Sequence, residues 1–537
     1  MKTRLLFLCV CTAFAGVSFV SAYNNKTIIP ISSDLYILIE NLYHETGRVP
    51  PNDSKPWTAD EMAAIVDEID PSGLSEAGRR AFTYLTGQLS KKDAAFSEDS
   101  FSFDSSPSLT IETFMHIPVK DTTDAKPESY EWIHGYEERR PFLHIPLEFW
   151  YGDTLYMISE LTAKEEYNSI TSPGTPDVAH NYFNILFDDP NIRLDLYFPF
   201  RAVLATGGDW WNFLFGRDKL CWGGGVTGNL MLSDYSDFYD FAGLTLFSPS
   251  FKMTNIYIVS DPFLPDGTDV GFSGFIGHRL EMRFLEKIKF VINESVTFAN
   301  LPPELPNDLN YLMVFHNWMS PERFNSLLSV ELEYTPWRYF SVYGHLAMDE
   351  FATTYEEERG GGGGPPIYGF LAGIKGSYPA GPGYINGVFE WVQTSPWLYN
   401  RRAAPYFYNV RKYWSLTTDA TEYATKPFGY EYGADSAVYF LSGSYSVPGS
   451  FSGNIDLTRI VQGEKQVGST WDPAPGDKPP TGIPEKKWII GFDGSWQLCR
   501  FINVGAGLNL SFTTNPRHID GEKRTDFEVT AFATAGL

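Results

Sequence analysis

The chain has 537 residues, with 41 Lys and Arg against 66 Asp and Glu, and a formal net charge of −25. This acidic balance lacks the basic surface that nucleic-acid binding requires, so nucleic acid is excluded as a partner. Aromatic residues make up 16% of the chain and charged residues only 20%, a composition typical of membrane barrels and of glycan-binding proteins.

The first 22 residues have the pattern of a secretory signal peptide. Two basic residues, Lys2 and Arg4, precede an apolar run that ends in small residues at Ala22, so the mature chain is expected to begin at residue 23. A retained membrane anchor is the alternative. After this segment only Cys221 and Cys499 remain, which allows one bridge but no disulfide framework. No later stretch has about 18 consecutive apolar residues, so any membrane crossing would use strands.

Residues 23–106 are predicted to form a small helical segment and a linker. Apolar residues recur at helical spacing over 33–45, and Gly47 follows as a stop signal. A capping box at Thr58–Glu61 opens a second helix, and a third follows Leu74. Residues 90–106 are polar and are predicted to be the linker.

From residue 107 onward, apolar and polar residues alternate with period two, which is typical of strands. A soluble sandwich or propeller would turn the apolar face inward, whereas a transmembrane barrel turns it toward lipid. Three features favour the barrel: aromatic residues at strand ends, as in 149–151 and 337–340, charged residues on the polar faces, and long polar loops that alternate with short connections. The alternation is clearest over 109–117, 192–198, 288–296, 488–498 and 504–512.

The predicted fold is mainly β, a transmembrane antiparallel β-barrel over 107–537 with a small helical N-terminal segment. At roughly 24 residues per strand and connection, this region gives about 18 strands. The last strand, 527–537, is expected to pair with the strand that begins near residue 107 and so close the barrel. The chain ends in Leu537, whereas such barrels usually end in an aromatic residue.

A stretch rich in tryptophan and glycine, residues 209–247, lies within the barrel region. Three consecutive glycines after Trp222 indicate a sharply bent backbone or a close approach to another segment. We expect Gly223–Gly225 to thin or turn the barrel wall, and Arg217 to point into a wet, acidic lumen.

This stretch resembles the Wzi family of outer-membrane capsule-assembly proteins, in which Gly-Arg and Trp-Gly-x-Gly elements precede a G-x-L-x-L-S strand. The 277–280 segment, with His278 and Arg279, is similar to the family's G-H-R-L strand, 343–351 to its Y-x-E/Q-x-A-x-D strand, and 36–89 to its N-terminal helices. The resemblance implies an outer-membrane barrel of about 18 strands, a helical portion in the periplasm, and a role with surface polysaccharide. The matching residues of the first motif are Gly216, Arg217, Trp222, Gly223, Gly225 and Gly228.

Motif searches favour a protein without catalytic residues, metal or cofactor. The chain has no G-x-S-x-G, H-E-x-x-H or P-loop motif and no cysteine spacing typical of a metal site. Glu148, next to three aromatic residues, suits a sugar site, but a lumen-facing charge is the preferred interpretation. His278 with Arg279 suits an acidic ligand, but an ion pair with Glu281 is preferred.

We therefore predict a non-enzymatic outer-membrane barrel that binds or organises surface polysaccharide, with outer-membrane lipid and surface polysaccharide as its partners. Trp471 with Asp472, and Tyr355 with Arg359, are the candidate loop contacts, because aromatic faces stack on sugar rings and charged groups bind hydroxyls. Many weak contacts along one polymer add through effective concentration. The alternatives are a porin whose acidic lumen favours cations and a secreted β-rich glycan hydrolase.

Overall fold

The computed structural model describes most of the chain after the predicted signal peptide. Residues 1–19 and the two predicted loop contacts Tyr355 and Arg359 fall outside the described residues. The described ranges are 20–22, 25–90, 92–94, 96–98, 100–121, 132–135, 138–165, 194–197, 200–236, 238–264, 267–299, 324–350, 366–415, 421–473 and 477–536.

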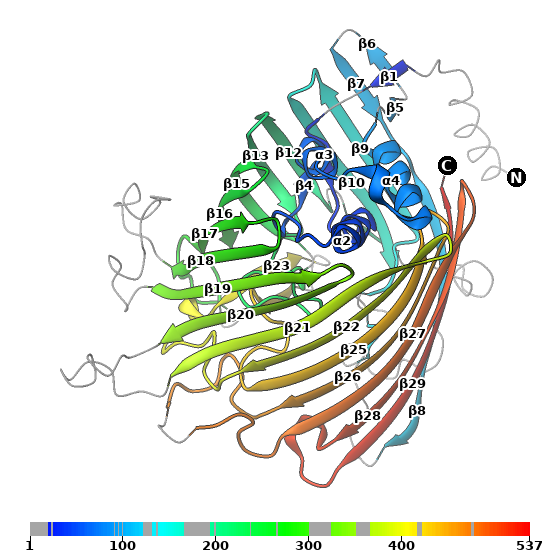
Figure 1. The fold of residues 1–537 in the computed structure, drawn as a ribbon. Coiled ribbons are helices and arrows are strands. Elements are labelled where there is room, and N and C mark those ends of the chain that lie inside the picture. The colour runs from blue at the N-terminus through cyan, green and yellow to red at the C-terminus, as the bar shows by residue number, and fades with distance from the viewer. Residues whose placement is uncertain are drawn as a thin grey trace, which may run out of the picture.

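Within these ranges, 18 strands form a closed antiparallel barrel (Figure 1), as predicted. The last strand, β29, pairs with β8 from Arg524 opposite Asp121 to Gly536 opposite Ser108, which closes the ring where the sequence places the seam. The strands are β8 (Ser108–Asp121), β9 (Leu143–Tyr151), β10 (Leu155–Glu165), β12 (Ala202–Gly208), β13 (Trp211–Asp218), β15 (Tyr239–Ser248), β16 (Phe251–Ser260), β17 (Ser273–Phe284), β18 (Ile288–Ala299), β19 (Phe324–Trp337), β20 (Phe340–Glu350), β21 (Ile367–Ala380), β22 (Gly383–Thr394), β25 (Ser436–Val447), β26 (Phe451–Gln462), β27 (Glu485–Cys499), β28 (Ile502–Thr514) and β29 (Lys523–Gly536); β11 (Leu194–Tyr197) pairs with β10 ahead of β12.

The strands turn their apolar faces outward. On β26, Ile455 is 51% exposed, whereas the neighbouring Asn454 and Asp456 on the other face are half-buried. This orientation is the one that a membrane barrel requires, because lipid solvates the outer face. A row of exposed aromatic side chains follows one rim of the barrel, as an interfacial girdle would. Its members are Tyr151, Trp210, Phe251, Phe284, Trp337, Tyr378, Phe451 and Trp496.

The two ends of the barrel differ in the length of their connections. At one end short turns join β9 to β10, β12 to β13, β15 to β16, β17 to β18, β19 to β20, β21 to β22, β25 to β26 and β27 to β28. We call it the short-turn end, and the opposite one the long-loop end. The aromatic row lies at the short-turn end. Trp150, which the sequence predicts to be part of the girdle at 149–151, does not belong to this row. Its ring faces inward, is 4% exposed and donates from Nε1 to Thr27 Oγ1 at 2.9 Å.

The N-terminal segment contains three helices, α2 (Leu35–Thr46), α3 (Ala59–Asp67) and α4 (Glu76–Leu89), as predicted. Gly47 ends α2 in the left-handed conformation with φ 74°, which glycine adopts at little cost. The predicted capping box is wrong: the Thr58 hydroxyl bonds to the Asp60 carboxylate, and Glu61 pairs with Lys252 of the barrel wall. No helix of the described chain has the length and apolar character needed to cross a membrane.

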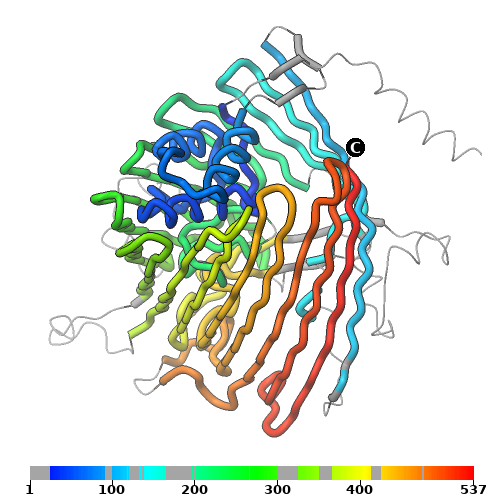
Figure 2. The backbone as a smooth tube through the Cα atoms, turned by 45° about the vertical axis from the view of Figure 1, so that its right-hand side comes forward, coloured from blue at the N-terminus to red at the C-terminus, as the bar shows by residue number. Residues whose placement is uncertain are grey.

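The helices lie inside the barrel toward its short-turn end. Leu42, Met62 and Leu85 form a buried core with Tyr384 of β22, so the helical core continues into the wall. Figure 2 shows the blue helices beside the green strands and away from the red C-terminal strands. Short elements flank the helices: β2 (Ile28–Ile29), β3 (Ser54–Lys55), β4 (Trp57–Thr58) and η1 (Pro71–Gly73).

The predicted linker at 90–106 contains strands. The element β5 (Lys92–Ala94) pairs with β1 (Val20–Ala22), which holds the predicted cleavage residues, and β6 (Phe96–Glu98) pairs with β7 (Phe101–Asp104). Because β7 also pairs with β9, it continues the wall next to β9 beyond the short β8–β9 pairing. The alternating phenylalanines of this segment carry a period-two signal that its polar composition obscured.

Candidate functional site

The chain between β22 and β25 folds inward at the long-loop end. It contains η3 (Ala404–Tyr406), β23 (Asn409–Ser415) and β24 (Thr421–Pro427). Its rings Tyr399, Tyr408 and Phe428 are fully buried, and Tyr408 meets Phe275 of the wall with ring centroids 5.7 Å apart. Tyr399 Oη donates to Leu230 O at 2.7 Å, and Tyr408 Oη to Met231 O at 3.0 Å. This inward chain is therefore fastened to the tryptophan–glycine stretch.

The middle of the tryptophan–glycine stretch, residues 219–236, lies inside the barrel, whereas the two ends of the stretch belong to the wall strands β13 and β15. Its strand β14 (Cys221–Trp222) pairs with β3 of the helical segment, and the Trp222 ring is 1% exposed, with its centroid 6.2 Å from that of Phe275. The expectation that Gly223–Gly225 thins the wall is thus wrong. Cys221 and Cys499 are free thiols, one buried and one exposed, and do not form the bridge that the sequence allows.

The glycines produce the predicted sharp bend, but the bend lies inside the barrel and not in the barrel wall. Gly223 and Gly228 have φ of +123° and +117°, and a Cβ on Gly225 would lie 2.1 Å from Gly228 O. The turn is held by Glu390 of β22, which is fully buried and accepts from the amides of Val226 and Thr227, each at 2.8 Å. These hydrogen bonds fasten the turn, and with it the tryptophan–glycine stretch, to strand β22 of the barrel wall.

Arg217 does not point into the lumen. It follows Gly216 on β13 and lies on the opposite face of the strand from Asp218, whose carboxylate binds Arg201 beside the helical segment. The Arg217 guanidinium instead binds Asp240 of β15, with Nε to Oδ1 at 2.7 Å, and both side chains keep a third or more of their surface exposed. Neighbouring residues of a strand lie on opposite faces, so a shift of one residue moves a side chain from the lumen to the outer face. The sequence pattern around Arg217 does not decide between these two faces.

Arg279 lies inside the barrel at the centre of a buried ion cluster. Its guanidinium is fully buried and binds Glu331 at 2.7 and 2.9 Å, Glu281 at 3.4 Å, and Asp53 of the helical segment. The predicted ion pair with Glu281 is confirmed. His278 faces the other way and bonds to Glu294 at 3.1 Å, so His278 and Arg279 do not form one acidic-ligand site.

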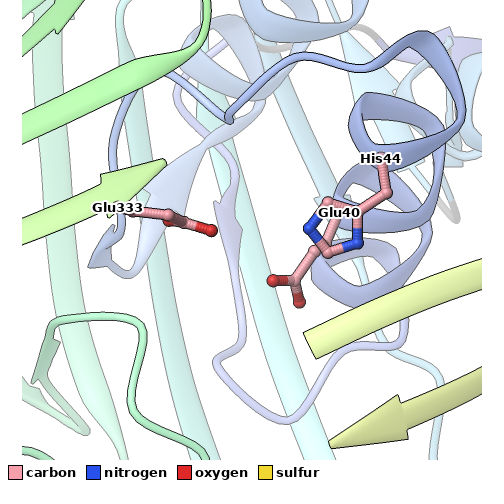
Figure 3. Close-up of side chains that lie close together, drawn as sticks. All are labelled: Glu40, His44 and Glu333. Carbon is pink, nitrogen blue, oxygen red and sulfur yellow. The ribbon is translucent and has the colours of Figure 1, made fainter. Parts of the chain in front are cut away.

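The ion cluster continues toward α2. Lys289 binds Asp53 at 2.6 Å and Glu333 at 2.7 Å, while Lys375 binds Glu333 at 3.3 Å and Glu40. Figure 3 shows Glu40 and His44 on α2 turned toward Glu333 of β19, a grouping that could hold a metal ion by distance. Two lysine ammonium groups already supply the positive charge here, so we assign the grouping to docking of the helical segment.

Trp471 and Asp472, the predicted contacts, lie in the loop that follows β26 at the long-loop end. Trp471 is half-buried and packs edge-on against the fully buried Trp397, with centroids 5.7 Å apart and planes at 65°. Trp397 Nε1 donates to Asp477 Oδ2 at 2.9 Å, and Lys465 Nζ lies 4.7 Å above its ring. Asp472 is exposed. The surface thus offers part of an indole ring beside carboxylate and ammonium groups.

This loop is fixed by a buried carboxylate at its base. Asp435 is fully buried and accepts from the amides of Lys465 and Thr481, both at 3.1 Å. Asn400 adds a contact, because its Oδ1 accepts from the Gly468 amide at 3.2 Å. Trp397, Asp435 and Asn400 were missed by sequence reasoning, since their positions carry no spacing signal relative to Trp471. A loop held in this way presents Trp471 in one orientation.

Glu431 supplies a pH-sensitive contact at the same end. Burial, together with the nearby Asp234 and Glu138 carboxylates, raises the pKa of its carboxyl to about 7, although a hydrogen bond with Tyr432 acts in the opposite direction. Because the folded pKa exceeds the ordinary value, this carboxyl stabilises the loop at acidic pH and that stabilisation is lost as pH rises through 7. We expect amide exchange over 428–435, corrected for intrinsic rates, to increase between pH 6 and 8. Glu431→Gln should remove this increase, and an unchanged pH dependence would contradict the assignment.

Comparisons with known proteins bear on the fold. A scan against protein-family models found no match, and no curated protein matches the chain. The chain is similar to the solved structure of Wzi from Escherichia coli, described as an outer membrane protein involved in group 1 capsule assembly and as a carbohydrate-binding β-barrel. The TM-score is 0.60, with 12% identity over 94% of this chain and 99% of that one.

Two further solved structures match more distantly. OccK1 of Pseudomonas aeruginosa and OccAB4 of Acinetobacter baumannii each give a TM-score of 0.40 over 81% of this chain, with 11% and 10% identity, and are covered over 99% and 98% of their own length. At such identities the likeness concerns the fold alone. The resemblance to Wzi therefore holds for the architecture, an outer-membrane-type β-barrel.

Proposed function

We propose that this protein is a non-enzymatic outer-membrane barrel that binds or organises surface polysaccharide through its long-loop end. The half-buried indole of Trp471, fixed in orientation by Trp397 and standing beside the exposed Asp472, is the observation that carries the proposal. An aromatic face covers the apolar side of a sugar ring, and carboxylates accept hydrogen bonds from hydroxyls. The description of Wzi as a carbohydrate-binding barrel of the same fold supports it.

We further propose that the long loops face the outside of the cell and the helices the periplasm. Outer-membrane barrels have short periplasmic turns and long extracellular loops, and the helical segment lies at the short-turn end, where its Glu45 carbonyl accepts from Arg338 of the β19–β20 turn at 2.6 Å. The predicted signal peptide agrees with export. In this arrangement the helices fill the lumen from the periplasmic side, and Trp471 contacts polymer on the outer side of the cell.

Loss of the indole should weaken polymer binding without affecting the barrel. Trp471→Ala is expected to reduce retention of surface polysaccharide about tenfold, or about 1.4 kcal/mol, because stacking is lost at each repeated contact. Asp472→Asn should have a smaller effect. The measurement is a pull-down of polysaccharide with purified protein, with heat-dependent gel mobility as the check on folding.

Phe263→Ala is the matched control, because Phe263 is also an exposed aromatic residue at the long-loop end and belongs to another loop, between β16 and β17. It should bind polymer as the parent protein does. Equal retention by Trp471→Ala and the parent would contradict the assignment of the site.

A second candidate function is a channel that favours cations. On the lumen-facing side of β26 and β27, Asp493 is exposed and Asp456 half-buried, and Asn454 Nδ2 donates to both carboxylates at 3.2 Å. The helices and the inward loops bury the lumen-facing groups of β17–β22, including Glu331 and Lys289. Any passage would therefore follow the β26–β27 side.

Single-channel recording separates the two candidates. A protein that anchors polymer through its loops should show no large steady conductance in planar bilayers, since filled lumens conduct poorly. A large conductance whose cation preference falls in Asp493→Asn would instead support the channel. Ser452→Ala, on the same face of β26, controls for a change in shape without a change in charge.

A further inference from the structure

The outward face of the barrel has a shallow apolar depression of about 720 Å³ over β22 and β25–β29. A row of small residues crosses four of these strands, because Gly453 is opposite Gly494, Gly494 opposite Ala506, and Ala506 opposite Ala531. Larger apolar side chains border the row on its long-loop side. These are Ile455, Phe492, Leu508 and Val529, which are also cross-strand neighbours. The lumen-facing residues that alternate with them, Ser444, Asn454, Asp493 and Gly507, complete the lining.

The depression is broad. Its lining residues come from six strands that are adjacent in the sheet (Figure 1). With about 4.8 Å between neighbouring strands, these strands span roughly 24 Å. Side chains on this face point into the hydrocarbon layer, so the depression offers an apolar surface on which several acyl chains can lie side by side.

The charged side chains on this outward face are all cationic. Within the described strands β22 and β25–β29, they are Arg459, Lys486 and Lys523, and no Asp or Glu faces outward. Arg459 is opposite Trp488, two residues from Lys486 on the same face, so the two cations are diagonal neighbours about 7–8 Å apart. Lys486 and Lys523 are both opposite Thr514. The acidic excess of the whole chain is therefore reversed on this face.

Arg459 lies against aromatic rings. Its guanidinium carbon is 5.2 Å from the centroid of the Trp488 ring, and Tyr439 is opposite Arg459 on the other neighbouring strand. The two rings are 41% and 40% exposed. Arg459 Nε makes no hydrogen bond within the described part of the chain, and Lys486 is exposed. The pair can therefore donate hydrogen bonds to an anion beside an aromatic surface.

The cations lie near the edge of the hydrocarbon layer. Arg459 is eight residues along β26 from Phe451, which belongs to the aromatic row at the short-turn end. Eight residues extend about 26 Å along a strand, or roughly 20 Å across the membrane at a tilt of about 40°. The apolar band of such barrels is about 25 Å tall. Arg459 and Lys486 are thus placed where lipid headgroups begin, which is the outer leaflet in the orientation proposed above.

We propose that this face binds a phosphorylated lipid of the outer leaflet. Its phosphate would lie between Arg459 and Lys486, and its acyl chains in the depression. Guanidinium and ammonium groups form charge-assisted hydrogen bonds with phosphate oxygens. The breadth of the depression and the further cation Lys523 favour a lipid with several acyl chains and two phosphates. The site goes beyond the polysaccharide contact at Trp471: it uses the proposed orientation of the barrel but not the glycan site.

Native mass spectrometry of the full-length protein in detergent micelles tests the proposal. The probes are lipid A with two phosphates, dephosphorylated lipid A and phosphatidylglycerol. Lipid A should bind one-to-one, and the other two lipids about tenfold more weakly or less, because each lost charge-assisted contact lowers affinity by about that factor. Excess inorganic phosphate should not displace lipid A, since it has no acyl chains. Equal binding of either other lipid, or displacement by phosphate, would overturn the proposal.

Variants locate the site. Replacing Arg459 and Lys486 together by glutamine should weaken lipid A binding at least about tenfold. Gly443→Ile, which fills part of the depression without a change in charge, should also weaken it. Arg500→Gln is the matched control, because Arg500 likewise lies over an exposed ring, 5.6 Å from the centroid of Phe501, but at the short-turn end. It should bind lipid A as the parent protein does.

Heat-dependent gel mobility verifies that each variant folds. Trp471→Ala should bind lipid A normally even where it loses polymer, so failure of the loop site and failure of the lipid site are distinguishable. Unchanged lipid A binding in the doubly substituted protein or in Gly443→Ile, or an equal loss in Arg500→Gln, would overturn the assignment.

Discussion

Replacing Arg279 with methionine is expected to release the helical segment from the barrel. The substitution leaves Glu281, Glu331 and Asp53 buried around an apolar side chain. Removal of one partner from a buried ion cluster costs about 3–5 kcal/mol, since the remaining charges keep their desolvation penalty. Limited proteolysis should cleave the 25–90 region of the variant much faster than that of the parent, while the strands remain protected.

Arg217→Met is the control for this experiment. Arg217 makes a similar two-oxygen contact with Asp240, but the pair is partly exposed, and exposed pairs contribute about 0–1 kcal/mol. Its proteolysis rate should match that of the parent. Equal cleavage rates in Arg279→Met and Arg217→Met would mean that the cluster does not hold the helices in place.

Gly225→Ala is expected to destabilise the interior by about 3 kcal/mol. The new Cβ would lie 2.1 Å from Gly228 O, so the turn must open, and overpacking of this kind costs typically about 1–3 kcal/mol. Opening also withdraws the Val226 and Thr227 amides from the buried Glu390 carboxylate, which adds an unsatisfied charge. The midpoint of urea unfolding in micelles, followed by tryptophan fluorescence, should fall accordingly.

Gly224→Ala is the control for the Gly225→Ala experiment. A Cβ on Gly224 would meet only the ends of two side chains, Asp53 Oδ2 at 3.3 Å and Lys375 Nζ at 3.4 Å, which can shift. Gly224→Ala should therefore cost much less than Gly225→Ala. If the two variants unfold at the same urea concentration, the close approach at Gly228 O is not what requires a glycine.

The regular parts of the fold could be predicted because their signals are local. Period-two alternation gave the strands, helical spacing and Gly47 gave the N-terminal helices, and the apolar C-terminal segment indicated the closing strand β29. Each of these signals lies within about ten residues of chain, where periodicity is informative. The glycines after Trp222 likewise indicated a bend, although not where in the molecule it lies.

The interior could not be predicted because it joins residues that are distant in the chain. Leu230–Leu232 is as apolar as a wall strand, and only its burial under Tyr399 and Tyr408 shows that it belongs to an inward loop. The contact of Asp53 with Arg279 has no counterpart in any local pattern. For Arg217, a single residue of register decided between lumen and outer face.

The candidate site was predicted in part. Trp471 and Asp472 are the aromatic and acidic residues of a long loop on which the prediction rests, and they lie at the long-loop end, but whether they bind glycan stays a prediction. Tyr355 and Arg359 are not among the described residues. The residues that orient Trp471, namely Trp397, Asp435 and Asn400, come from another loop, and pairing between loops leaves no periodic trace in sequence.

The ion cluster also has a consequence for the order of events during synthesis. The Glu61–Lys252 and Asp53–Arg279 contacts join residues 191 and 226 positions apart, and contacts of such long sequence separation form late in folding. Until the barrel strands exist, the carboxylates of the helical segment have water as their partner. The N-terminal helices are thus translated before the barrel strands and are among the last elements to reach their final contacts, and a chain interrupted before β21 would lack the Lys375 that pairs with Glu40 of α2.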